Sequence, residues 1–215
     1  MRFIGRLKYA FYVIFHPFKG FWELKNEKRG SLGAGLTIFF VCMFSNILRG
    51  QFTGYLFNKY YPENADAFLI IIQSATMYFL WCIANWCLTT LMNGEGTGKE
   101  ILTAVGYCLL PLIFANILVM LLSNTFSLEE STFLLYIDGF AYLWTGFLIF
   151  SATAVIHQFS ASKTVLVIVL TLSLIHISVN CPRRILLNIQ TKNIVSPAPK
   201  LPRFSFFSSQ KPLKG

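Results

Sequence analysis

The chain has 215 residues, of which 55% are hydrophobic, 16% aromatic and only 13% charged. Soluble domains carry about 25% charged residues, so this composition excludes an ordinary soluble domain and favours a single membrane domain. The formal net charge of +9 does not indicate nucleic-acid binding, because residues 181–215 hold seven of the 18 Lys and Arg residues and residues 1–180 carry only +2.

The first 30 residues, "MRFIGRLKYAFYVIFHPFKGFWELKNEKRG", are too charged to cross a membrane. They also lack the apolar core and small-residue cleavage site of a removable signal peptide. Apolar residues follow helical spacing up to Pro17, which is expected to stop or restart the helix. We predict basic amphipathic helices in this cytoplasmic segment, a type of helix that lies in the headgroup plane.

Aromatic residues of this segment form a candidate docking surface for the membrane or for a partner protein. A plain anchor that only fixes the first span is the alternative, and His16 beside Pro17 also fits a simple turn. The candidate docking residues are Phe11, His16, Pro17, Phe21 and Trp22.

Five hydrophobic segments follow, and a helix of ~20 apolar residues is enough to cross the hydrocarbon core. An open backbone cannot satisfy its hydrogen bonds in lipid, so we predict that all five are helices. The expected fold is all-α: a polytopic transmembrane helical bundle of about five spans with amphipathic N-terminal helices. Within a bundle domain of residues 31–180, the spans are about 32–57, 68–91, 101–122, 132–156 and 164–179.

The run "MNGEGTGKEIL" at residues 92–102 contains the second half of a phosphate-binding loop. That loop requires G-x-x-x-x-G-K-[S/T] after a buried strand. Asn93 stands where the first Gly should be, Glu100 occupies the Ser/Thr position, and uncharged spans flank the run. We therefore predict a turn between two spans, with Lys99 and Glu100 facing water, and no nucleotide cofactor.

Arg49 and Asp138 are the only charged residues inside the predicted spans. A charge near a helix centre costs at least ~2.5–3.5 kcal/mol on insertion scales, so a partner or a function is expected. Both residues fall toward the outer end of the bundle, where we predict a candidate intramembrane ion pair. The alternative is that each reaches the interface separately.

Other features of the spans indicate packing. Four amides predict hydrogen bonds between helices: Asn46, Gln73, Asn85 and Asn116. Pro111 predicts an interruption of the third span. Small residues permit close helix approach: Gly33, Gly35, Gly106 and Gly146. The five cysteines lack metal-ligand spacing and no catalytic motif occurs, so we expect no enzyme active site, no metal and no cofactor.

Orientation follows from Lys and Arg in the short flanking segments. Residues 1–30 hold seven of them, which places the N-terminus in the cytoplasm of a cell-membrane protein. The rule fails after the fifth segment, because residues 181–215 hold seven Lys and Arg, no acidic residue and five of the eight prolines. Either the fifth segment does not cross the membrane, or the tail is foreign to the fold. We interpret the tail as disordered, or as an out-of-frame artefact joined to the fold within residues 170–184.

Three stretches in order carry a family resemblance: "FHPFKGFWELKNEKRGS", "RGQFTGYLFN" and "GEGTGKEILTAVGYCLLP". Over roughly residues 9–172 the chain resembles the bacterial branch of the Yip (Ypt-interacting protein) domain family. The family-like loop comprises Gly94, Glu95, Gly96 and Lys99. The resemblance implies a five-span bundle with a cytoplasmic N-terminus, whose fifth span should continue apolar beyond Leu172.

Eukaryotic relatives in this family are implicated in Rab GTPase association, vesicle traffic and membrane shaping. The acidic D-L-[DY]-G-P signature of those relatives is absent, so a GTPase partner does not carry over. We therefore expect a non-catalytic scaffold or regulator that binds other membrane or cytoplasmic proteins, with a homo-oligomer as a further possibility. The alternative is a small permease or channel component that uses Arg49 and Asp138 within the bundle.

Overall fold

The computed structural model describes residues 3–54, 57 and 67–195, and these residues form helices and connecting turns without a strand. The prediction of an all-α polytopic bundle is confirmed, because five stretches are long and apolar enough to cross a membrane. They are Leu32–Phe52, Ala67–Leu91, Gly98–Leu122, Ser131–His157 and Ala161–Ser178.

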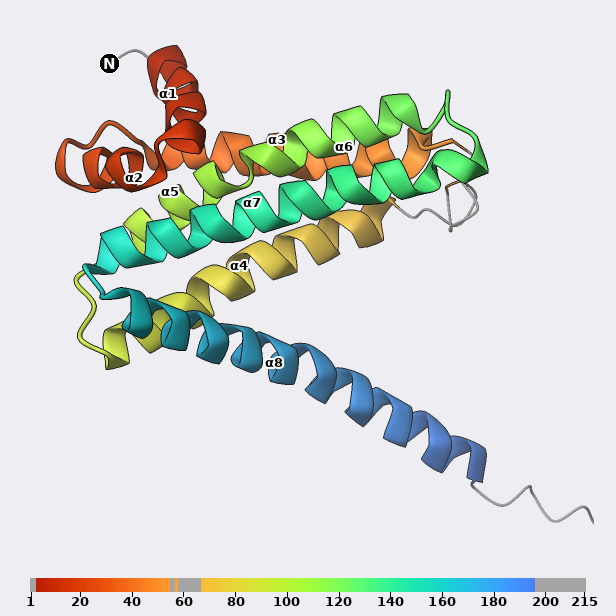
Figure 1. Ribbon diagram of the computed structural model, residues 1–215. Coiled ribbons are helices and arrows are strands. Elements are labelled where there is room, and N and C mark those ends of the chain that lie inside the picture. Colours follow the sequence, from red (N-terminus) through yellow and green to blue (C-terminus); the bar gives the residue numbers. More distant parts are fainter. Residues whose placement is uncertain (1–2, 55–56, 58–66, 196–215) are drawn as a thin grey trace, which may run out of the picture. The chain divides into compact units, whose positions relative to one another are not determined.

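Figure 1 shows the order of the elements along the chain. The N-terminal pair, α1 (Phe3–Phe15) and α2 (Pro17–Asn26), precedes the long helices α3 (Leu32–Phe52) and α4 (Ala67–Leu91). The third span consists of α5 (Gly98–Cys108) and α6 (Leu110–Leu122). A short 3₁₀ turn, η2 (Leu128–Glu130), leads into α7 (Ser131–His157), and α8 (Ala161–Val195) follows.

Helix α8 passes from one compact unit, residues 1–175, into a second, residues 176–215. Helix therefore covers residues 181–195, where the sequence predicted an irregular tail. Ile185 and Ile189 lie one helical turn apart there, and four of the five tail prolines come only after Val195. Residues 55–56, 58–66 and 196–215 lie outside the described residues, and these include Lys59, Glu63 and Asp66 between the first two predicted spans.

Local capping sets where several helices begin. The Ser31 hydroxyl accepts a hydrogen bond from the Ala34 amide at 3.2 Å and starts α3. Thr97 and Glu100 form a capping box, so α5 begins at Gly98 and not at residue 101 as predicted. The first span ends at Phe52, earlier than the predicted residue 57, because the Gly54 amide donates to the Ser123 hydroxyl at 3.0 Å.

Pro111 interrupts the third span, as the sequence predicted. It lies in the first turn of α6, where its missing N–H is tolerated. Leu109 separates the two helical pieces, and its amide donates to the Gly106 carbonyl at 3.3 Å.

Two glycines bring α3 and α5 into close contact. A Cβ atom added to Gly106 would lie 2.5 Å from the Gly35 carbonyl oxygen, and one added to Gly35 would lie 2.9 Å from the Thr103 carbonyl oxygen. Small residues of this kind let helix backbones approach in membranes. The expectation for Gly146 is wrong, because a Cβ there would meet nothing within 4 Å.

The N-terminal pair shares the main core of the bundle. Phe21 of α2 and Val13 of α1 are fully buried in one cluster with Tyr107 of α5 and Leu148 of α7. The pair is therefore packed as part of the folded bundle.

Candidate functional site

A polar cluster joins α3, α6 and α7 at the end of the bundle where α3 ends and α7 begins, here called the distal end. The Arg49 guanidinium donates to both carboxylate oxygens of Asp138, at 2.7 and 2.6 Å. Arg49 also donates to the Asn116 side-chain oxygen at 3.1 Å. The structure thus brings the two intramembrane charges together in bidentate geometry, the strongest form of such a contact.

Asn116 extends this cluster in a way that the sequence did not specify. Its amide nitrogen donates to the Asn46 oxygen at 2.7 Å and to the Ser45 hydroxyl at 3.0 Å. Sequence reasoning identified Asn116 only as one of several amides that could join helices. Its contact with Arg49 depends on the facing of α3 and α6, for which the sequence has no local signal.

A cavity of about 920 Å³, here called the distal cavity, borders this cluster. Residues of α3, α4, α6 and α7 line it, together with Val105 of α5. The polar lining residues include Arg49, Asp138, Asn46 and Gln73. Of the four predicted amides, Gln73 therefore lines the cavity without belonging to the cluster.

The glycine loop lies at the opposite end of the bundle, here called the glycine-loop end, and packs onto His157. His157 lies just beyond the predicted fourth span, 132–156, but it is the last residue of α7 and only 2% exposed. The Gly96 amide donates to the His157 Nδ1 atom at 3.3 Å. Added Cβ atoms at Gly94 and Gly96 would lie 2.6 and 2.5 Å from the imidazole, so both glycines permit close approach to this ring.

Two lysines, Lys25 and Lys163, make contacts around the glycine loop. The Lys25 ammonium donates to the Ile156 carbonyl at 2.8 Å and pairs with Glu95 at 3.4 Å. The Lys163 ammonium lies 4.9 Å from the centre of the Phe159 ring, which stacks on His157. Lys99 is exposed at the start of α5, and Glu100 serves the capping box.

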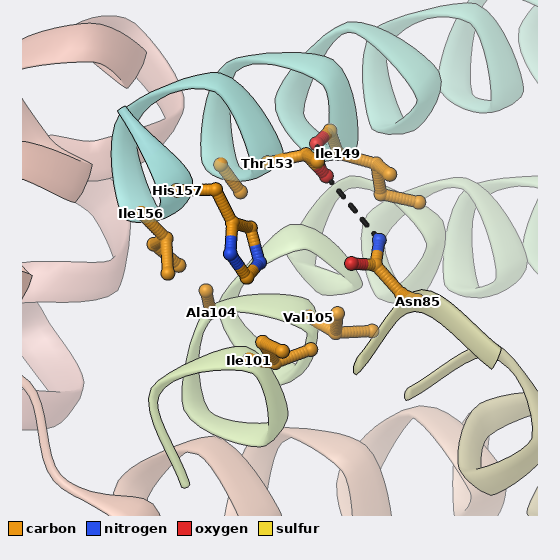
Figure 2. Close-up of a pocket in the computed structure, with 9 residues that line it drawn as sticks. Asn85, Ile101, Ala104, Val105, Ile149, Thr153, Ile156 and His157 are labelled. Atoms are coloured by element: carbon orange, nitrogen blue, oxygen red, sulfur yellow. Dashed lines mark hydrogen bonds between the residues drawn. The ribbon is translucent and has the colours of Figure 1, made fainter. Parts of the chain in front are cut away.

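Figure 2 shows a small cavity beside His157, between α4, α5 and α7. Its volume is about 10 Å³, the space of about one water molecule. The Asn85 side chain, 2% exposed, donates to the Thr153 hydroxyl at 3.5 Å. Its carbonyl oxygen has no partner among the described residues. A single bound water there would satisfy it.

Gly96→Ala is expected to destabilise the fold by about 1–3 kcal/mol, the usual cost of overpacking a filled site. The new methyl group would meet the His157 ring and Ile156, and both side chains are buried. Thermal unfolding of the purified protein measures the loss. Gly98→Ala is the matched control, because its Cβ would meet only Trp86, at 3.9 Å. Equal effects at both positions would contradict the role assigned to Gly96.

The predicted docking residues divide between surface and core. Phe11 and Trp22 are about half exposed, and His16 is exposed and stacks on Tyr12 with ring centres 4.9 Å apart. Pro17 begins α2. Phe21 is fully buried, so its assignment to a docking surface is wrong. The reason is the facing of α2, whose buried side packs against α7 and α5.

Side-chain hydrogen bonds hold the N-terminal pair in place. The Tyr9 hydroxyl donates to the Gly20 carbonyl at 2.8 Å and to the Glu23 carboxylate at 3.2 Å. Burial and then the nearby Glu23 charge raise the pKa of Tyr9, so it remains a neutral donor. The Tyr107 hydroxyl donates to the Arg6 carbonyl at 3.0 Å and ties α1 to α5.

The donor set for a metal ion is missing from the part of the chain that the structure describes, where no three His, Cys, Asp or Glu side chains converge. Cys42, Cys82 and Cys108 are buried thiols, whereas Cys87 is exposed.

Comparison with known protein families identifies a family model that covers most of the chain. The model of the Yip1 domain matches residues 11–179, which include the last five residues of α1, all of α2 to α7, and α8 up to residue 179. No curated protein and no solved structure matches the chain.

Proposed function

The chain belongs to the Yip1 domain family, and on this basis we propose that it is a non-catalytic scaffold or regulator of partner proteins in the cell membrane. Its five apolar helices support a multi-pass arrangement. The ionisable groups inside the bundle also support a structural role, because Asp138 is paired with Arg49 and His157 packs against the glycine loop.

One surface carries this proposal. On α1 and α2, large apolar side chains remain exposed although the opposite faces of both helices are buried in the core. Their exposed fractions are Ile4 65%, Phe11 49%, Phe15 75%, Phe18 49% and Trp22 52%. Lys8 and Lys19 are exposed on the same two helices. We call this set of seven residues the N-terminal surface.

Phe18 of the N-terminal surface contacts the membrane-spanning helix α7. The Phe18 and Phe147 rings are 6.1 Å apart, and Phe147 lies ten residues before His157, or ~15 Å at 1.5 Å per residue. Helix α7 has 27 residues, or ~40 Å, and so exceeds a hydrocarbon core of ~30 Å. Phe18 therefore lies within the membrane-spanning length of α7, on the glycine-loop side of its middle. Because the N-terminal segment is basic, we expect that end of the bundle to face the cytoplasm.

The distinction between a protein partner and lipid alone can be tested by site-specific photo-cross-linking in intact cells. A photoreactive amino acid at Trp22 is expected to give a discrete protein adduct of defined mass. The matched control is Leu143, which is 70% exposed on the membrane-spanning helix α7 and is expected to give lipid adducts only. Lipid adducts alone at both positions would contradict the scaffold proposal. They would indicate instead that the N-terminal surface only anchors the protein in the membrane.

The geometry favours this reading over a permease that uses Arg49 and Asp138. A permeation step would require the Arg49–Asp138 pair to separate as a solute passes. Both carboxylate oxygens of Asp138 already accept from Arg49, and Asn116 holds the same guanidinium from a third helix. Such an arrangement supports a structural role, in which the polar cluster holds α3, α6 and α7 together.

A further inference from the structure

We propose that the distal cavity binds one zwitterionic glycerophospholipid drawn from the bilayer. Its volume of about 920 Å³ lies within the range of about 300–1,000 Å³ typical of small-ligand sites. Because four of the five membrane-spanning stretches contribute to its lining, the molecules available to fill it are lipids.

The polarity of the lining changes along the cavity. Its charged and amide side chains, Arg49, Asp138, Asn46 and Gln73, lie in the distal half, among apolar residues such as Ile70, Val119 and Leu134. Toward the middle of the bundle it becomes largely apolar, with Phe39, Met43, Val105, Leu109 and Ile149. This order matches an amphiphile whose headgroup lies at the distal end and whose acyl chains extend toward the middle.

The charges of the lining select the headgroup. Arg49 and Asp138 form a neutral pair, and their side chains retain 28% and 20% exposure. Arg guanidinium groups bind phosphate well, and a carboxylate attracts an ammonium group. A phosphoethanolamine headgroup carries both charges and can align with both residues. A net anionic headgroup would bring its charge to Asp138 without a compensating cation.

Two hydrogen-bond donors deeper in the cavity match the rest of such a lipid. The Thr145 hydroxyl and the Trp81 indole N–H are buried and have no partner among the described residues. Thr145 is 5% exposed, and unlike Thr153 and Thr171 it has no bond to the carbonyl four residues earlier. A diester phospholipid brings two ester carbonyls, which accept hydrogen bonds and cannot donate.

The depth of these donors agrees with that arrangement. Thr145 and Trp81 each lie fourteen residues from the distal ends of α7 and α4. Asp138 lies two helical turns above Thr145 on the same helix, or ~10 Å. A lipid whose ammonium group meets Asp138 therefore has its ester region directed toward both donors.

Native mass spectrometry of the purified protein with defined lipids tests this proposal. Diester phosphatidylethanolamine is expected to bind as one molecule per chain, about tenfold more tightly than phosphatidylglycerol, because one charge-assisted contact is lost. Its dialkyl ether analogue, which lacks both carbonyls, is expected to bind about fivefold more weakly. Thr145→Val should reduce the difference between ester and ether lipids, and an unchanged difference would overturn the role of Thr145.

A matched pair of variants tests the location. Ser74 lines the cavity from α4, whereas Thr76 of the same helix is exposed and does not line it. Ser74→Trp is expected to abolish the bound lipid, and Thr76→Trp is expected to retain it. Thermal unfolding confirms that both variants are folded. Equal retention by both variants, or equal binding of the two diester lipids by the original chain, would overturn the proposal.

Discussion

Reversal of the charge at Arg49 alone, by Arg49→Asp, is expected to destabilise the bundle by about 2.5–3.5 kcal/mol, the cost of a lone charge within a span. Asp138 would then face a second carboxylate, and Asn116 would lose its contact with the guanidinium. Asp138→Arg should be comparably harmful. The double variant Arg49→Asp/Asp138→Arg should recover most of the loss, because it restores opposite charges at the same positions.

The stability of the two single variants and the double variant can be measured through buried thiols. Cys42, Cys82 and Cys108 are at most 5% exposed, so a thiol-reactive fluorophore reports their release on heating. Replacement of Cys87 and Cys181 by Ser removes the remaining thiols from the signal. Lys99→Glu is the control, because it reverses an exposed charge outside the cluster. A double variant no more stable than either single variant would show that the pair contributes no coupling energy.

Gly106→Ala is expected to lower the free energy of unfolding of the bundle. The loss should lie in the upper part of the usual range for overpacking, about 1–3 kcal/mol, or above it. The added Cβ would lie 2.5 Å from the Gly35 carbonyl oxygen. Backbone atoms of α3 cannot rotate away as a side chain can, so the two helices must separate. Gly106→Leu should prevent recovery of folded protein.

Two glycines in α7 provide the control for Gly106. A Cβ at Gly139 or Gly146 would meet nothing within 4 Å, so Ala at either position is expected to be neutral or stabilising. The thiol assay compares all three alanine variants under the same conditions. If Gly106→Ala unfolds at the same temperature as Gly139→Ala, the close contact between α3 and α5 does not limit stability.

Local properties of the chain determined much of the fold. Uninterrupted apolar stretches predicted the five spans, since the length needed to cross a bilayer depends on composition alone. Pro111 predicted the interruption between α5 and α6, because a proline ring has its effect within its own helical turn. Arg49 and Asp138 could be paired in advance because only two charges lay within the spans and both lay toward the same end.

The facing of the helices could be decided only by the tertiary structure. Phe21 and Trp22 are neighbours of similar character, yet one is fully buried and the other 52% exposed, because α2 packs one side against α7 and α5. Helical spacing predicts that an apolar face exists, but a helix that meets both protein and lipid offers apolar residues to each. Hydrophobicity cannot distinguish those two environments.

The same reason applies to the sites at the two ends of the bundle. The glycines of residues 94–96 pack against the buried His157, which lies some sixty residues later in the chain. Asn116 accepts a hydrogen bond from Arg49, which lies on another helix. The distal cavity is likewise formed by residues distant in sequence. Sequence by itself determined which segments enter the membrane, because that depends on local transfer free energy. The tertiary structure decided which polar groups meet, because that depends on the rotation of each helix against its neighbours.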